Sequence, residues 1–201
     1  AHIAIVTFEL LVPDRSGGIG TWSANLAMSL RAAGHAVTIF HARTRHTDSA
    51  WRVRYWEGHG IELVRLGCDD RRPFVENTLH NLAHVALEAL ASRRWDIVHL
   101  PDALALGWQI AAAKRAGLAF KDTTIVVTLH GNNWWHRTSN RLPMHAHDIE
   151  LDHLEREQIR GADVVLSPSA YMLEYVGRTY PGLIKSGFVH QNPIAWPFRI
   201  R

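Results

Sequence analysis

The sequence predicts a doubly wound α/β fold, with a Rossmann-like, mainly parallel sheet and helices on both faces. Strand-like and helix-like segments alternate along the chain, and several strand-like segments are continuous apolar runs. Such runs are typical of strands that are buried on both faces of a parallel sheet. Gly34 and Gly117 stand where helix C-caps belong, because glycine readily adopts the left-handed conformation that ends many helices.

The expected strands are short and rich in apolar residues. In order they are Ile3–Phe8, Ala36–His41, Ile61–Leu66, Ile97–Leu100, Thr124–Leu129, Val164–Ser167 and Gly187–His190. Helices with apolar residues at 3.6-residue spacing lie between them, for example over Trp22–Ala33 and Val75–Leu90. We expect the segment Trp51–Leu66 to depart from this alternation and to form two strands around Gly58–Gly60.

Length and composition predict one globular domain. A chain of 201 residues with 47% hydrophobic and 20% charged residues can bury one sizeable core. We place this domain at residues 1–190 and the start of a linker at 191–201, where Pro193 and Pro197 break the last segment. The chain has no apolar run of the roughly 20 residues that span a bilayer, and no secretory pattern, so we expect a cytoplasmic protein. The single Cys68 agrees with a reducing compartment.

The formal net charge of +3 is modest, but arginines occur in close pairs, such as Arg43 with Arg45 and Arg71 with Arg72. Such pairs could contact phosphates or anionic lipid. No aromatic pattern of an RNA-binding sheet and no helix-turn-helix accompanies them. We therefore interpret them as a solvated face and expect no nucleic-acid partner, while contact with a membrane surface stays open.

A glycine-rich stretch, Gly17, Gly18, Ile19 and Gly20, lies between the first expected strand and the first expected helix. Glycines let a backbone approach a ligand closely, and a helix N-terminus offers unpaired N–H groups to an anion. The stretch therefore predicts a phosphate site built from peptide groups. A plain strand-to-helix turn is the alternative, because the spacing differs from the Gly-x-Gly-x-x-Gly of dinucleotide sites.

In a doubly wound sheet, ligands lie outside the carboxyl ends of the strands. His130 directly follows one expected strand, and Asn132, Asn133 and Trp134 come next. The imidazole and the carboxamides can donate hydrogen bonds to sugar hydroxyls or phosphate oxygens, and an indole face suits a sugar ring. The alternative is a polar loop that is held in place by buried indoles.

Two further positions follow strands in the same way. Asp102 could bind an acceptor hydroxyl or could cap the helix that follows it. Ser169 can cap the helix from Ala170 to Tyr180, whose first N–H groups would then face an anion. No Ser-His-Asp order and no Gly-x-Ser-x-Gly elbow supports hydrolase chemistry.

Two histidine groupings suggest a metal site. His80 and His84 have helical spacing, and His145 and His147 precede Asp148 and Asp152. Neither grouping shows His-Glu-x-x-His, and no cysteine cluster accompanies them. We interpret them as surface histidines and expect no metal cofactor.

Taken in order, these pieces resemble the N-terminal domain of the retaining GT-B glycosyltransferases of family 4. The resemblance covers essentially the whole chain. It is carried by Gly17–Gly20, Ala32–Thr38, Asp96–His99, Val127–Gly131, Gly161–Ser169 and the closing Asn192-Pro193.

This resemblance implies two Rossmann-like domains that face a cleft, with the nucleotide-sugar held mainly by a C-terminal domain that these residues do not include. It implies that the amides of Gly17–Gly20 approach the donor diphosphate and that His130 lies beside the transferred sugar. It also implies that Asp102, Asn132 and Asn133 shape an acceptor pocket for a glycan, a lipid or a small molecule. It further implies a retaining reaction that needs no dedicated protein base and usually no metal. We expect these 201 residues alone to be nearly inactive.

Other function classes remain open from the sequence. The chain could be a module that binds a nucleotide or a sugar phosphate without transferring anything, or part of another GT-B-like enzyme such as a nucleotide-sugar epimerase. A nicotinamide dehydrogenase fits less well, because the second expected strand leads into His41 and Ala42 and not into an acidic residue. Transfer at the inner face of a membrane would agree with a lipid acceptor.

Overall fold

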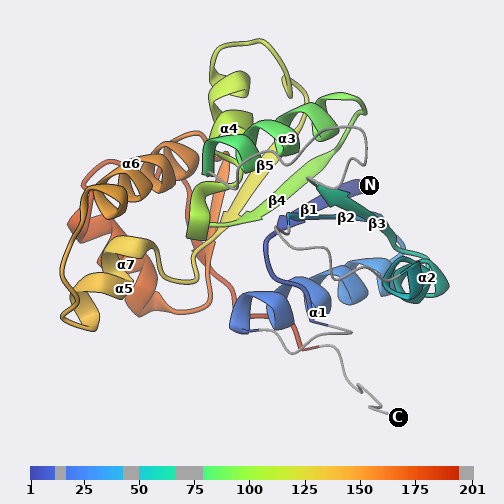
Figure 1. Ribbon diagram of the computed structural model, residues 1–201, viewed down its shortest axis with the longest axis horizontal. Helices are drawn as coiled ribbons and strands as arrows, with labels where there is room; N and C mark the ends of the chain where they lie inside the picture. Colours follow the sequence, from blue (N-terminus) through green and yellow to red (C-terminus); the bar gives the residue numbers. More distant parts are fainter. Residues whose placement is uncertain (12–16, 43–49, 67–78, 195–201) are drawn as a thin grey trace.

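The computed structural model describes residues 1–11, 17–42, 50–66 and 79–194. The described residues form one parallel sheet with helices on both faces (Figure 1). The strands are β1 (His2–Thr7), β2 (Ala36–Ala42), β3 (Glu62–Leu66), β4 (Ile97–Pro101), β5 (Thr124–Thr128), β6 (Val164–Ser167) and β7 (Gly187–Val189). The helices are α1 (Gly18–Ala32), α2 (Ala50–Gly58), α3 (Leu79–Ala91), the 3-10 turn η1 (Ala103–Ala105), α4 (Trp108–Arg115), α5 (Asn133–Ser139), α6 (Ala146–Arg160) and α7 (Ala170–Thr179).

The strand order is β3-β2-β1-β4-β5-β6-β7, and every neighbouring pair is parallel. The order changes direction between β1 and β4, which pair through Ile3 with Ile97 and Ile5 with His99. In doubly wound sheets the crevice at this change of direction is where ligands bind. The fold class expected from the sequence is confirmed.

Two apolar layers enclose the sheet. On one face, α1 and α2 cover Ile5, Val37 and Ile39 of the central strands. On the other face, α3 and α4 cover residues such as Val98 and Ile125, and α7 continues this layer toward β6 (Figure 1). Because the central strands are buried from both sides, their sequences are continuous apolar runs.

The expectation of two strands over Trp51–Leu66 is wrong in its first half. Residues Ala50–Gly58 form α2, and only Glu62–Leu66 form a strand, which pairs parallel with β2. Val53 and Trp56 lie three residues apart and so share a helix face, where Trp56 is fully buried. Two parallel neighbours also cannot be joined by a tight hairpin, so a helix has to make the crossover.

Other expected elements are confirmed where the structure describes them. Gly34 and Gly117 have φ values of +87° and +71° at the ends of α1 and α4. Residues 75–78 of one expected helix lie outside the described residues, as do Cys68, the pairs Arg43/Arg45 and Arg71/Arg72, and residues 195–201 of the expected linker. Within the described ranges, no helix is long and apolar enough to cross a membrane.

Candidate functional site

The polar residues predicted from the sequence follow three neighbouring strands at the carboxyl edge of the sheet. The glycine loop, residues 17–20, follows β1, Asp102 follows β4, and His130 follows β5. We call residues 129–132, which join β5 to α5, the His130 loop. Because β1, β4 and β5 are adjacent and parallel, these segments meet at one end of the sheet.

The glycine loop forms the N-terminus of α1, with Gly17 as the N-cap residue. Gly17 and Gly18 are exposed, whereas Gly20 is buried. The Gly20 amide donates to Glu9 Oε2 at 3.3 Å, and a Cβ on Gly17 would stand 2.8 Å from the same carboxylate oxygen. A side-chain carboxylate therefore lies at the helix end where the sequence predicts a bound anion.

Trp22, on the first turns of α1, connects the glycine loop to the His130 loop. Its ring lies edge-on to the His130 imidazole, with ring centres 4.6 Å apart. It also lies edge-on to His99 of β4, at 5.2 Å. Trp22 is 3% exposed, so the three rings form a cluster close to the start of α1.

Both histidines of this cluster are held neutral. Burial lowers the pKa of His130 to about 4. Burial lowers the pKa of His99 to about 3, and the proximity of His130 adds to this effect. The His99 Nε2 lies 2.7 Å from Thr128 Oγ1, whereas the buried Nε2 of His130 has no hydrogen-bond partner among the described residues. At neutral pH, His130 is therefore an uncharged imidazole.

A cavity of about 230 Å³ lies beside this cluster. Its walls include Trp22 and Leu26 of α1, His99 and Thr128 of the sheet, and Asn192 of the chain after β7. The Asn192-Pro193 segment on which the resemblance partly depends is thus near the predicted site.

Asp102 is completely buried. Its Oδ1 accepts from the His130 amide at 2.8 Å, and its Oδ2 accepts from the Gly131 amide at 3.3 Å. Burial raises the pKa of Asp102 to about 6, although these hydrogen bonds oppose the shift. Asp102 thus holds the backbone of the His130 loop and makes no side-chain cap to the 3-10 turn that follows it, while its contact with an acceptor hydroxyl stays a prediction.

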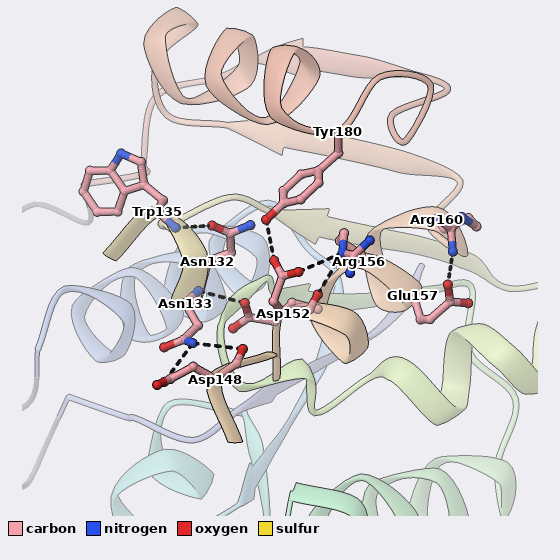
Figure 2. A network of polar contacts seen from close by, with 10 residues as sticks. Asn132, Asn133, Trp135, Asp148, Asp152, Arg156, Glu157, Arg160 and Tyr180 are labelled. Carbon is pink, nitrogen blue, oxygen red and sulfur yellow. Dashed lines mark hydrogen bonds and ion pairs between the residues drawn. The ribbon is translucent and has the colours of Figure 1, made fainter. Parts of the chain in front are cut away.

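Asn132 and Asn133 also act on the local backbone. The Asn132 side chain is buried and accepts from the Trp135 amide at 2.9 Å, which makes it the N-cap of α5 (Figure 2). Asn133 Nδ2 donates to Asp148 Oδ1 at 3.1 Å. Trp134 is half-buried on α5. Gly131 has a φ of +110°, and a Cβ there would lie 2.6 Å from the Trp135 ring.

The remaining predictions have simpler outcomes. Ser169 caps α7 through the Met172 amide at 3.2 Å, as expected. In the two histidine groupings considered for a metal, His80 contacts Glu150 at 2.7 Å and Asp148 pairs with Arg137 at 2.8 Å. Within the described part of the chain, no three His, Cys, Asp or Glu side chains converge on a metal position.

Three residues of the site were not singled out from the sequence. His99 lies in the middle of an apolar strand, Glu9 precedes the glycine loop, and Glu155 lies on α6, where it is 1% exposed. Glu155 shares a helix face with Asp148 and Asp152, at spacings of seven and three residues. Acidic residues on a face that also buries Leu151 and Leu154 were the available signal.

A family model described as Glycosyltransferase Family 4 matches residues 16–186. The chain belongs to this family. The match extends from the glycine loop through β6 and α7 and ends just before β7, and so includes His130 and the elements that hold it. No curated protein shows significant sequence similarity to the chain.

Solved structures share the fold at low identity. Sucrose-phosphate synthase from Thermosynechococcus elongatus aligns with a TM-score of 0.56 and 16% identity, over 98% of this chain and 90% of that one. The catalytic domain of starch synthase IV from Arabidopsis thaliana, bound to ADP and acarbose, aligns with a TM-score of 0.64 and 16% identity, over 95% of this chain and 51% of that one. Together with the family match, these likenesses identify the domain as the N-terminal half of a GT-B fold.

A structure from Listeria monocytogenes, described as a UDP-N-acetylglucosamine 2-epimerase, aligns with a TM-score of 0.55 and 12% identity. The alignment covers 89% of this chain and 42% of the Listeria chain. The chain thus spans about half of the starch synthase domain and less than half of this structure. At these identities the likeness shows the fold alone.

Proposed function

We propose that this domain is the acceptor-side half of a retaining glycosyltransferase, which moves a sugar from a nucleotide-sugar to a glycan, lipid or small-molecule acceptor. The observation that carries the proposal is the position of His130, packed on Trp22 beside the glycine loop with its Nε2 unpartnered among the described residues. The donor-binding half would follow residue 201. The nucleotide in the starch synthase structure supports a donor of this class.

In this proposal His130 acts as a neutral hydrogen-bonding group and not as an acid. With a pKa of about 4 it carries no proton to give near pH 7. An uncharged imidazole can still bind a sugar hydroxyl next to the breaking bond. Departure of the nucleotide diphosphate would leave an oxocarbenium-like sugar, which fixed dipoles at this edge would stabilise. The donor phosphate would assist deprotonation of the acceptor.

The glycine loop would meet the donor diphosphate through its amides. Glu9 now accepts from the Gly20 amide, so a phosphate oxygen would have to replace this carboxylate oxygen. The hydrogen bond is 3.3 Å long and partly exposed, which makes such an exchange inexpensive.

The alternative functions differ in their products. An epimerase would change the nucleotide-sugar without any acceptor, and a binding module would leave it intact. The likeness to the Listeria structure favours including the epimerase in the test.

The test is an assay of the full-length gene product with a panel of labelled nucleotide-sugars and with glycan and lipid acceptors. We expect acceptor-dependent release of nucleoside diphosphate and a product whose new bond keeps the donor's anomeric configuration. An inverted product would contradict the retaining mechanism. Altered donor without acceptor would indicate an epimerase, and binding without turnover across the panel would indicate a binding module.

A further inference from the structure

One face of α6 presents three acidic side chains to the loops at the edge of the sheet. Asp148, Asp152 and Glu155 lie on this face, and each is at most 5% exposed. Asp148 accepts from Asn133, and Asp152 accepts from the Tyr180 hydroxyl (Figure 2). Asp148 also forms an ion pair with Arg137. Glu155 differs from both, because it accepts from two backbone amides and from no side chain among the described residues.

Glu155 joins the loops that follow two neighbouring strands. Its Oε1 accepts from the Leu104 amide at 3.1 Å, just after β4. Its Oε2 accepts from the Asn133 amide at 2.7 Å, just after the His130 loop. One carboxylate therefore fixes the relative positions of the two backbones that leave β4 and β5.

Asp102 makes two further contacts with the backbone of the same region. It accepts from His130 and Gly131, so Asp102 and Glu155 together accept from three of the four amides over residues 130–133. Burial and the nearby Asp102 raise the pKa of Glu155 well above its usual value. Among the described ion pairs none includes either carboxylate.

This arrangement is costly for a purely structural role. Two neighbouring buried carboxylates without a cation destabilise a fold unless their hydrogen bonds compensate. The segment that Glu155 holds is also strained, because Leu104 and Ala105 have φ values of +60° and +48°. Backbone strain of this kind concentrates at functional sites. Gln158, one helical turn further along α6, also binds the backbone of this segment. It accepts from the Gly107 amide and donates to the Pro101 carbonyl oxygen, both at 2.7 Å.

We propose that Glu155 is a positioning residue for the transfer reaction. Together with Asp102 it fixes the His130 loop, so that the His130 imidazole stays against Trp22. Glu155 does not touch a substrate, because it is 1% exposed and both of its oxygens are occupied. The catalytic part of this proposal rests on the proposed function, whereas the positioning of His130 does not.

The first variant is Glu155→Gln. Glutamine is nearly isosteric but has one acceptor oxygen and one NH₂ group, so it cannot accept from both Leu104 and Asn133. Glu157→Gln is the matched control, because it removes a carboxylate from the same helix. The Glu157 side chain pairs with Arg115 and Arg160 and makes no hydrogen bond to the His130 loop among the described residues.

The second variant removes the backbone N–H that donates to Glu155 and keeps the Glu155 carboxylate. Asn133 is the first residue of α5, where proline is well tolerated, and Asn132 before it is extended at φ −66° and ψ 168°, as proline requires. Asn133→Pro therefore deletes the N–H that Glu155 accepts. Asn133→Ala keeps this N–H and loses only the side chain, so the difference between the two variants reports the backbone hydrogen bond.

The readout in the 201-residue chain is NMR of the His130 imidazole, with hydrogen exchange of the His130 and Gly131 amides. We expect Glu155→Gln and Asn133→Pro to shift the imidazole resonances and to speed amide exchange by about tenfold or more. Glu157→Gln and Asn133→Ala should leave both signals close to wild type. In the full-length gene product, Glu155→Gln should lower kcat on the order of 10- to 100-fold, with the donor KM nearly unchanged.

A folded Glu155→Gln with unchanged His130 signals would overturn the proposal. If Glu155→Gln does not fold, equal spectra of Asn133→Pro and Asn133→Ala would overturn it. Shifted signals with unchanged kcat would also overturn it, because the loop would then move without consequence for transfer. The NMR readout needs no donor, so a wild type that transfers no sugar would refute the proposed function and leave the positioning result readable.

Discussion

The glycine loop and the His130 loop lie at the same edge of the sheet, but their backbones are held differently. In the glycine loop, the Gly20 amide donates to the partly buried carboxylate of Glu9 at 3.3 Å. In the His130 loop, the amides of His130 and Gly131 meet the fully buried Asp102, and the Asn132 side chain caps the next helix. The contact in the glycine loop is longer and only partly buried, whereas the side chains that hold the His130 loop are fully buried.

The difference corresponds to two tasks in the proposed reaction. A backbone that binds a phosphate has to exchange its present partner for the ligand. A loop that presents a catalytic side chain gains from being fixed before the substrate arrives, because a misplacement of 1 Å costs about a hundredfold in rate. Substitutions that disturb the backbone should therefore affect binding at the glycine loop and folding at the His130 loop.

The largest expected effect contrasts two glycines. Gly131→Ala should destabilise the fold by about 2–4 kcal/mol, because its φ of +110° and the Trp135 ring at 2.6 Å both exclude a Cβ. Gly18→Ala meets nothing within 4 Å and should change the stability by less than about 1 kcal/mol. Urea denaturation measures both, and nucleotide-sugar binding to the full-length product should fall only for Gly18→Ala among folded variants. Equal destabilisation would remove the contrast between the loops.

The second effect is a pH dependence that originates at the histidine cluster. In the unfolded chain His99 binds a proton below about pH 6.5, whereas in the folded chain it does so only near pH 3. Its contribution to stability is therefore present above pH 6.5 and is lost as the pH falls toward 3. Asp102 acts in the opposite sense, because its raised pKa stabilises the fold as the pH falls from about 6 to 3.8.

The His99 contribution is isolated by comparing wild type with His99→Gln in urea at several pH values. Between pH 7 and pH 5 the variant should gain about 2 kcal/mol relative to wild type, because the folded wild type resists protonation. Parallel curves would show that His99 binds protons equally in both states and would contradict the burial argument.

The smallest effect concerns Glu9. Glu9→Gln removes a negative charge from the N-terminus of α1 and should lower the stability by less than about 1 kcal/mol. It should also strengthen pyrophosphate binding about two- to fivefold, because the anion no longer competes with a carboxylate. Calorimetry measures the affinity, with the exposed Glu57→Gln as control. Weaker binding by Glu9→Gln would mean that the carboxylate shapes the loop and does not occupy its ligand position.

Much of the fold could be predicted because its signals are local. Apolar runs marked the strands, and Gly34 and Gly117 marked helix ends. The region of α2 was misassigned because Gly58 and Gly60 also fit a hairpin, and only the parallel pairing of β3 with β2 excludes one. That pairing joins residues far apart in the sequence, so no local pattern contains it.

The places of the candidate residues in the fold could be predicted, but their contacts could not. The strand-edge rule selected His130 and Asp102, because both directly follow strands. The role of Asp102 as a backbone acceptor depends on its burial, which tertiary packing decides. Glu155 is 51 residues from Leu104 and 22 from Asn133, so their contacts could be found only from the folded structure.

The most direct test of the account measures transfer by His130→Ala in the full-length gene product, with His136→Ala as control. His136 is an exposed histidine on α5, six residues from His130. We predict that His130→Ala lowers kcat by about tenfold or more with the melting temperature nearly unchanged, while His136→Ala transfers sugar like wild type. An unchanged kcat for His130→Ala would remove His130 from the site and would contradict the central claim.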